Sequence, residues 1–195
     1  AFASAQQRPI DKEFLDAVQK KDFSQINLLL SKGANVNARE PTNGYFALQT
    51  AINWPDLALV KLLLDKGANV NLADNSGYTA LIESMGNASP EHTAIAKLLI
   101  ERGADIHAKH EAAILRAVKE ASPEVVRLLV AKGAAVNART EDPDGNTVLM
   151  EAASGGSVET LTLLLNAGAD LKATNNKGET ALMKAVALDH RYAPA

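Results

Sequence analysis

Two histidines and a glutamate stand together near the middle of the chain. His107 and His110 are three residues apart, and Glu111 follows directly. Two imidazoles and a carboxylate can bind zinc when the fold holds them around the ion. The segment reads as a turn and offers no further clear ligand, so we predict no metal ion and no other cofactor. A small-molecule or metal site that uses residues 86–110 is kept as an alternative.

A second candidate is the stretch DPDGN at residues 142–146, which partly resembles a calcium-binding loop with Glu151 downstream. An EF-hand loop places Gly after the third ligand and its closing Glu two positions further along than Glu151 stands. Here Gly145 precedes the third polar residue, Asn146. We therefore interpret the stretch as an Asp-Gly turn.

Motifs of covalent and nucleotide chemistry do not occur in the sequence. The chain has no Cys, which excludes disulfides, thiolate nucleophiles and Cys-ligated zinc. Neither Gly-x-Ser-x-Gly, nor a P-loop, nor Gly-x-Gly-x-x-Gly is found. We predict that the protein is not an enzyme.

Composition points to packed helices. Apolar residues make up 47% of the chain but aromatics only 4%, so Leu and Ala must supply the core. The net charge of −3 comes without a basic stripe, which argues against nucleic-acid binding. No apolar stretch is long enough to span a bilayer, so we expect no membrane insertion.

Two strings recur along the chain, out of phase with each other. The first is LLLSKGANVNA at 28–38, LLLDKGANVNL at 62–72, LLIERGADIHA at 98–108, LLVAKGAAVNA at 128–138 and LLLNAGADLKA at 163–173. The second is ALQTAI at 47–52, ALIESM at 80–85, AILRAV at 113–118, VLMEAA at 148–153 and ALMKAV at 181–186, with starts 33, 33, 35 and 33 residues apart.

Each repeat predicts a pair of short helices. The second string places small residues such as Ala47 and Ala51 at helical spacing, which allows close approach of neighbours. The first string carries an apolar face and ends in Gly, which closes a helix in the left-handed conformation. Ser-Pro-Glu at 89–91 and 122–124 predicts helix starts with Ser as N-cap. One such pair cannot bury its apolar face alone, so the units must stack.

The period and residues resemble the ankyrin-repeat family. The resemblance rests on Gly44, Gly77, Gly145 and Gly178 at the openings, on Thr79-Ala80-Leu81 and its equivalents, and on the five Leu-Leu-x-x-Gly-Ala endings. It implies an all-α solenoid of helix-turn-helix units joined by β-turn or hairpin fingers. We expect a flexible segment at 1–9, repeats over 10–190 (units about 10–40, 41–73, 74–106, 107–141, 142–174 and a partial 175–190) and a tail at 191–195.

Several units depart from the family pattern. The family's His, which helps to tie adjacent loops together, is replaced by Gln49 and its equivalents, so that hydrogen-bond network is in doubt. His107 stands where the family usually has Asn. The first unit reads as a cap with a polar outer face. The finger before His110 is shortened to a blunt turn, the loop around 86–92 is lengthened, and the last unit lacks its second helix. We expect its end to fray or to be held by a partner.

The resemblance also implies a binding surface on the fingers and the exposed side of the first helices. Carried residue by residue onto this chain, that surface includes Asn43, Tyr45, Asn53, Trp54, Ser76, Tyr78, Asn87, Lys109, Glu111, Lys119, Asp144 and Asn146. We expect its two tyrosines and the single tryptophan to lie close together. Tyr and Trp are enriched in binding hot spots.

We therefore predict a monomeric module that binds another protein through its concave surface. A structural spacer or scaffold within a larger chain is the alternative from a different class. The start Ala3-Ser4-Ala5 has the small-x-small form of a signal-peptidase site. Export, to a bacterial periplasm for example, is therefore slightly favoured over a cytoplasmic location.

Overall fold

A computed structural model describes residues 7–120, 122–155 and 157–192 of the chain. These residues form eleven helices and no strands. The helices are α1 (Pro9–Gln19), α2 (Phe23–Ser31), α3 (Ala47–Asn53), α4 (Leu57–Asp65), α5 (Ala80–Ser84), α6 (Pro90–Glu101), α7 (Ala108–Glu120), α8 (Pro123–Ala131), α9 (Val148–Gly155), α10 (Val158–Asn166) and α11 (Ala181–Tyr192).

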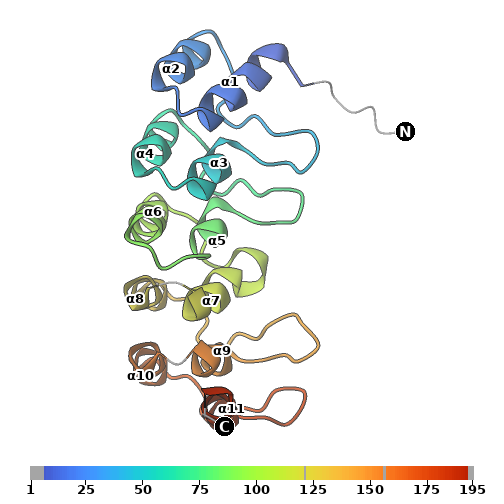
Figure 1. Ribbon diagram of the computed structural model, residues 1–195, viewed down its shortest axis with the longest axis vertical. Helices are drawn as coiled ribbons and strands as arrows, with labels where there is room; N and C mark the ends of the chain where they lie inside the picture. Colours follow the sequence, from blue (N-terminus) through green and yellow to red (C-terminus); the bar gives the residue numbers. More distant parts are fainter. Residues whose placement is uncertain (1–6, 121, 156, 193–195) are drawn as a thin grey trace, which may run out of the picture.

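The helices stack in one direction as two parallel columns (Figure 1). The first helices of the units form one column, which consists of α1, α3, α5, α7, α9 and α11. The second helices form the other column, which consists of α2, α4, α6, α8 and α10. α1 and α11 lie at opposite ends of the stack, and loops project sideways from the first-helix column. This is the solenoid of helix-turn-helix units that the repeat predicts.

Small residues let the first helices approach one another. Ala47, Ala51, Ala80, Ala113 and Ala117 are buried, as their helical spacing predicts. The second helices contribute the bulk of the core through side chains at i, i+3 and i+4, such as Val60 and Leu63 on α4. In α1 the outward residues are charged while Phe14 is fully buried, which confirms the polar cap.

Turns and caps follow the sequence in most units. All five predicted closing glycines have positive φ, +91° at Gly33 for example. Ser89 caps α6 by accepting a hydrogen bond from the N–H of His92 at 3.3 Å. Ser122 occupies the N-cap position of α8, but its hydroxyl accepts from Thr93 at 3.2 Å and makes no cap bond. That prediction was correct for the position and wrong for the bond.

Three fingers are closed by isolated β-bridges, Arg39 with Phe46, Ala73 with Thr79 and Arg139 with Thr147. The first residues of α7 differ. Lys109, His110 and Glu111 have φ values of +50°, +51° and +62°, so the chain makes a left-handed turn there. Figure 1 shows a short coiled segment at this level, which projects less than the neighbouring loops, as the predicted blunt turn requires.

The two remaining loop predictions can also be located. The connection between α5 and α6 spans 85–89, longer than the connection 54–56 between α3 and α4, as expected. At the last unit, α11 runs to Tyr192, two residues beyond the expected end of the repeats, and no helix follows it within the described residues. Most of the expected flexible segment, and the Ala3-Ser4-Ala5 pattern, lie outside the described residues.

Candidate partner-binding surface

Three hollows follow one another along the fingers and the first helices. The first, of about 280 Å³, is bordered by Asn43, Tyr45, Asn53 and Trp54. The second, of about 450 Å³, shares Asn43 and Tyr45 with the first and adds Ser76 and Tyr78. Tyr78 also borders the third, of about 440 Å³, together with Lys109, Arg116 and Lys119. Because neighbouring hollows share residues, they form one groove, which we call the finger groove.

Trp54 is placed by the turn between α3 and α4. It follows the last residue of α3, and its side chain is 65% exposed. Asp56 then caps α4 by accepting from the N–H of Leu59 at 3.0 Å. Pro55 therefore interrupts the helical backbone where the repeat needs a turn, and the indole of Trp54 lies at the border of the finger groove.

The fingers hold their own side chains in fixed turns. The Asn43 carboxamide oxygen accepts from the N–H of Tyr45 at 2.9 Å, and the Asn43 carbonyl accepts from the N–H of Asn75 on the next finger at 3.2 Å. The Asp74 carboxylate accepts from the N–H groups of Ser76 and Tyr78 at 2.8 and 2.9 Å. The groove wall is therefore preformed.

The ring of Tyr78 carries a cation. The Lys109 ammonium lies 3.3 Å from the ring centroid, a cation–π contact. Both side chains are half-buried, so Tyr78 presents less of its face than Trp54 does.

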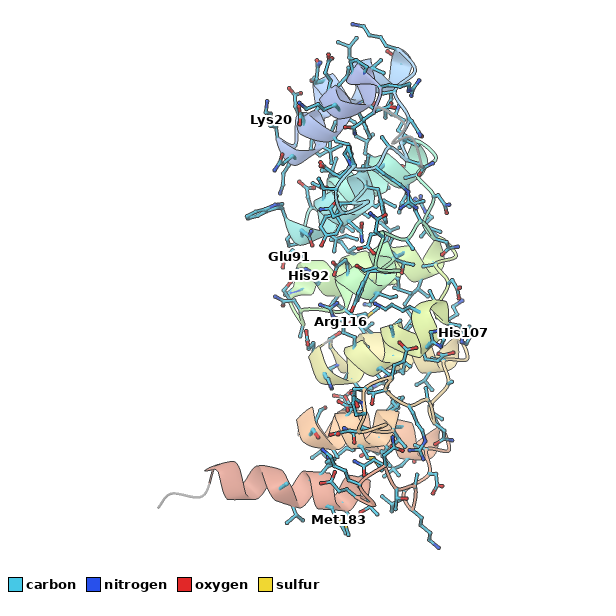
Figure 2. The ribbon with its side chains drawn as sticks, turned by 90° about the vertical axis from the view of Figure 1, so that its right-hand side faces the viewer. Lys20, Glu91, His92, His107, Arg116 and Met183 are labelled. Atoms are coloured by element: carbon cyan, nitrogen blue, oxygen red, sulfur yellow. The ribbon has the colours of Figure 1, made fainter. Side chains whose placement is uncertain are left out.

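Charged residues of α5, α7 and α9 form ion pairs along the groove. Arg116 lies 3.6 Å from Glu83, and Lys119 pairs with Glu151. Figure 2 looks onto the side where the loops project and shows Arg116 near the middle of this face, between α5 and α7. Arg116 and Glu83 are not among the binding residues expected from the sequence. The available signal is that both occupy the fourth position of the second repeated string, 33 residues apart.

Four of the expected binding residues lie outside these three hollows. Asn87 is exposed in the loop between α5 and α6, where its side chain accepts from the N–H of Ser89 at 2.8 Å. Glu111 lies 2.5 Å from His107. Asp144 pairs with Lys177 at 2.7 Å, which raises the pKa of that lysine, and Asn146 donates to Glu151 at 2.8 Å.

The calcium-like stretch is a finger turn. The Asp142 carboxylate accepts from the N–H groups of Asp144 and Gly145 at 2.9 and 3.2 Å. Burial raises the pKa of Asp142, but hydrogen bonds from Thr140 and these two N–H groups outweigh it, and the net pKa is lowered. Gly145 has a φ of +60°, as a left-handed turn position requires.

The histidines of the first metal candidate face different carboxylates. His107 pairs with Glu111, whereas His110 lies 3.4 Å from Glu141. Across the described ranges, no three His, Cys, Asp or Glu residues are grouped closely enough to hold a metal ion. Nor does any helix in that part of the chain have the length and apolar character needed to cross a membrane.

Comparisons with known proteins agree with the repeat. A family model described as "Ankyrin repeats (3 copies)" matches residues 14–110 and 114–193. A protein of Treponema pallidum (strain Nichols) described as ankyrin repeat-containing is 41% identical over 70 residues. The match covers 36% of this chain and 23% of that relative's length.

Solved structures match over nearly the whole chain. An ankyrin repeat domain (ABAYE2397) from Acinetobacter baumannii AYE has a TM-score of 0.78 at 26% identity, covering 91% of this chain and 92% of that one. A chain from the complex of the predatory endopeptidase Bd0816 of Bdellovibrio bacteriovorus with the immunity protein Bd3460 has a TM-score of 0.75 at 28% identity, covering 92% of this chain and 93% of that one.

Ankyrin repeats generally mediate protein–protein interaction, and their fold is typically non-catalytic. The family model covers well over half of the sequence, and the stacked helix pairs have the architecture that the family implies. The chain therefore belongs to the ankyrin-repeat family.

Proposed function

We propose that this protein is a non-catalytic binding module whose protein partner docks in the finger groove. The observation that carries the proposal is the exposed indole of Trp54, which borders the same hollow as Tyr45. Isolated exposed apolar residues are common, but a large ring beside a second ring at a preformed groove is typical of a binding anchor.

The rigidity of the groove supports the proposal. Finger turns held by Asn43 and Asp74 keep Tyr45 and Tyr78 in place before any partner arrives. A preformed surface loses little conformational entropy on binding, so more of the contact energy contributes to affinity.

The test needs the partner first. Affinity capture from the source cells, followed by identification and purification of the captured protein, supplies it for calorimetric titration. Trp54→Ala should weaken binding by about thirtyfold or more, because hot-spot rings contribute about 2 kcal/mol or more. Val158→Ala removes an exposed apolar side chain from α10, a second helix, and should leave affinity unchanged. Equal affinity of Trp54→Ala, Tyr45→Ala and the unchanged protein would contradict docking in the finger groove.

A second candidate function is the binding and inhibition of an enzyme. It is favoured by the solved neighbour that comes from a complex of an endopeptidase with an immunity protein. If the captured partner is an enzyme, its activity should fall in proportion to the fraction bound in the same titration. Full activity at saturation would exclude this second candidate and leave the binding proposal intact.

A further inference from the structure

The row of fingers is interrupted at the fourth unit. Fingers closed by β-bridges flank the gap, at Ala73–Thr79 on one side and Arg139–Thr147 on the other. Between them, the left-handed turn at 109–111 forms the start of α7 (Figure 1). The third hollow of the finger groove opens at this level, and we call it the notch.

The notch combines an apolar floor with cationic walls. Ile82 and Leu115 line the floor, and the ring of Tyr78 closes one side. Lys109, Arg116 and Lys119 border the same volume. A floor of this kind suits an apolar side chain, and its walls suit a negative charge placed next to that side chain.

Two ion pairs turn their cations toward the notch. The Arg116 side chain is 34% exposed and its partner Glu83 18%. For Lys119 and Glu151 the values are 46% and 4%. The carboxylates lie deeper, and the guanidinium and ammonium groups stand in front of them. Lys109 adds a third cation, held on the Tyr78 ring.

The notch also has two carboxylates among its lining residues, and both stand at its edge. Glu120 is the last residue of α7 and is exposed. Glu141 belongs to the next finger and lies 3.4 Å from the His110 imidazole. The centre of the notch therefore favours an anion more than its edge does.

We propose that the notch binds a segment of the partner protein that carries an Asp or Glu beside an apolar side chain. The apolar group packs on Ile82 and Leu115, and the carboxylate lies between Lys109 and Arg116. Because the fourth unit has no projecting finger, the segment enters from the side. This inference rests on the proposed function and specifies which chemistry the partner brings to one part of the finger groove.

The probe for this inference is a phage-displayed library of random peptides, selected on the immobilised full chain. Enriched sequences should carry Asp or Glu next to an apolar residue. A synthetic peptide of the most enriched sequence should bind about tenfold more tightly than its Glu→Gln or Asp→Asn form, and more weakly at high salt.

Matched variants locate the binding. Lys109→Glu and Arg116→Gln should each weaken the peptide about tenfold, whereas Lys61→Glu on α4 makes the charge change of the first variant away from the groove and should have no effect. Thermal unfolding of each variant verifies that it is folded. If one of the two notch variants unfolds, the other still decides.

The outcomes separate this inference from the proposed function. The notch proposal is contradicted if the selected peptides are not enriched in Asp or Glu. It is also contradicted if they bind Lys109→Glu and Arg116→Gln as tightly as the unchanged protein. If Trp54→Ala instead weakens the binding of those peptides, docking in the finger groove is supported and binding of an acidic segment in the notch is excluded. Selection of no peptide above an unrelated control protein also overturns the notch, and the titration with the captured partner still tests the groove.

Discussion

Gln49 shows how one residue can replace another in a loop network. It stands where the family has His, it is fully buried, and its side-chain nitrogen donates to the Asp74 carboxylate at 3.1 Å and to the Tyr78 carbonyl at 3.2 Å. Both acceptors belong to the next finger. The hydrogen bonds between adjacent loops, which the missing His put in doubt, are therefore present at this unit, and the Gln49 amide is their donor.

Removing this donor should destabilise the protein. Gln49→Ala leaves the Asp74 carboxylate and the Tyr78 carbonyl without it, and we expect a loss of about 1–3 kcal/mol in the free energy of unfolding. Urea denaturation followed by circular dichroism measures the change. Asn53→Ala, an exposed site on the same helix, serves as control and should stay within about 0.5 kcal/mol. Equal stability of the two variants would contradict this role of Gln49.

A second residue-scale pattern runs along the first helices. The fourth position of the second repeated string is Thr50, Glu83, Arg116, Glu151 and Lys184 in successive units. Glu83 and Arg116 pair directly, and Glu151 pairs with Lys119 one turn further along α7. The alternation of charge is readable in the sequence once the repeats are aligned. Which cations face outward depends on burial and is not readable there.

At the scale of the helix, the two Ser-Pro starts look alike and behave differently. The Ser89 hydroxyl accepts from the N–H of His92, whereas the Ser122 hydroxyl is turned to Thr93 in the previous unit. The two sites share Ser-Pro-Glu but differ at the next residue, which is His92 in one and Val125 in the other. The His92 imidazole also lies 3.0 Å from the Ser89 hydroxyl, so the local sequence and the neighbouring unit both contribute to the difference.

Ser89→Ala should therefore lower stability by about 1 kcal/mol, the usual value for a lost N-cap. Ser122→Ala removes only a bond between two hydroxyls and should lower it by less. Chemical denaturation of the two variants side by side measures the difference. A larger loss in Ser122→Ala would show that the contact with Thr93, not the cap, stabilises this part of the stack.

The left-handed turn at the start of α7 supplies a hydrogen-bond acceptor that His107 does not. In other units an Asn at the equivalent position accepts from a backbone N–H of the next unit, as Asn37 does from Asn69 at 2.7 Å. His107 stands at that position, and the Glu111 carboxylate accepts from the N–H of Ala135 at 3.4 Å in its place. The turn brings Glu111 beside His107, within reach of that N–H.

Three consecutive non-Gly residues in this conformation are strained, at about 1 kcal/mol each. His110→Gly should therefore raise the free energy of unfolding by up to about 1 kcal/mol, since its exposed pair with Glu141 contributes little. Ala112→Gly, in the helical part of α7, should lower it by a similar amount. Thermal and urea unfolding test both. A loss of stability in His110→Gly would mean that this turn is not strained.

At the scale of the whole molecule, stability comes from contacts between neighbouring units. The N-terminal end is closed by charged residues of α1. At the other end, the apolar side chains of Leu182, Met183 and Val186 on α11 are exposed. In earlier units, the equivalent side chains face the next helix pair. Figure 2 shows Met183 at this end of the stack. We expected a partner to hold this last unit, and that a partner covers these side chains stays a prediction.

Acid should weaken the stack from its N-terminal unit. The hydrogen bond from Arg8 lowers the pKa of Asp11 below its usual 3.8, burial opposes this, and the N–H of Asn35 lowers it further. The unfolded chain then binds the proton more readily than the folded one, so stability rises with pH across this range. The stabilisation is present above about 3.8 and is lost as the pH falls through the folded-state value.

Asp11→Asn should remove part of this dependence. We expect it to lower stability by up to about 1 kcal/mol at neutral pH and by less in acid, because the exposed Arg8 limits the pair. Urea denaturation between neutral pH and about pH 3 measures the slope, with the exposed Asp16→Asn as control. Parallel pH profiles for Asp11→Asn and the unchanged protein would contradict the role of Asp11.

The sequence by itself determined the repeat, the helix pairs and the positions of the turns. A helix pair cannot bury its apolar face without a neighbour, so a period of 33 residues with Leu, Ala and Gly at set positions leaves stacking as the outcome. The blunt fourth finger and the place of Trp54 between two helices follow from the same alignment.

The tertiary structure alone decided how the side chains share the groove. Lys109 lies on Tyr78, Gln49 donates to Asp74, and Arg116 and Lys119 stand in front of carboxylates that are less exposed than they are. Each of these contacts joins residues about one repeat apart, where spacing along the chain carries no information on side-chain direction. Packing between units sets these directions, because only the stacked neighbour determines which atoms are buried and which face the partner.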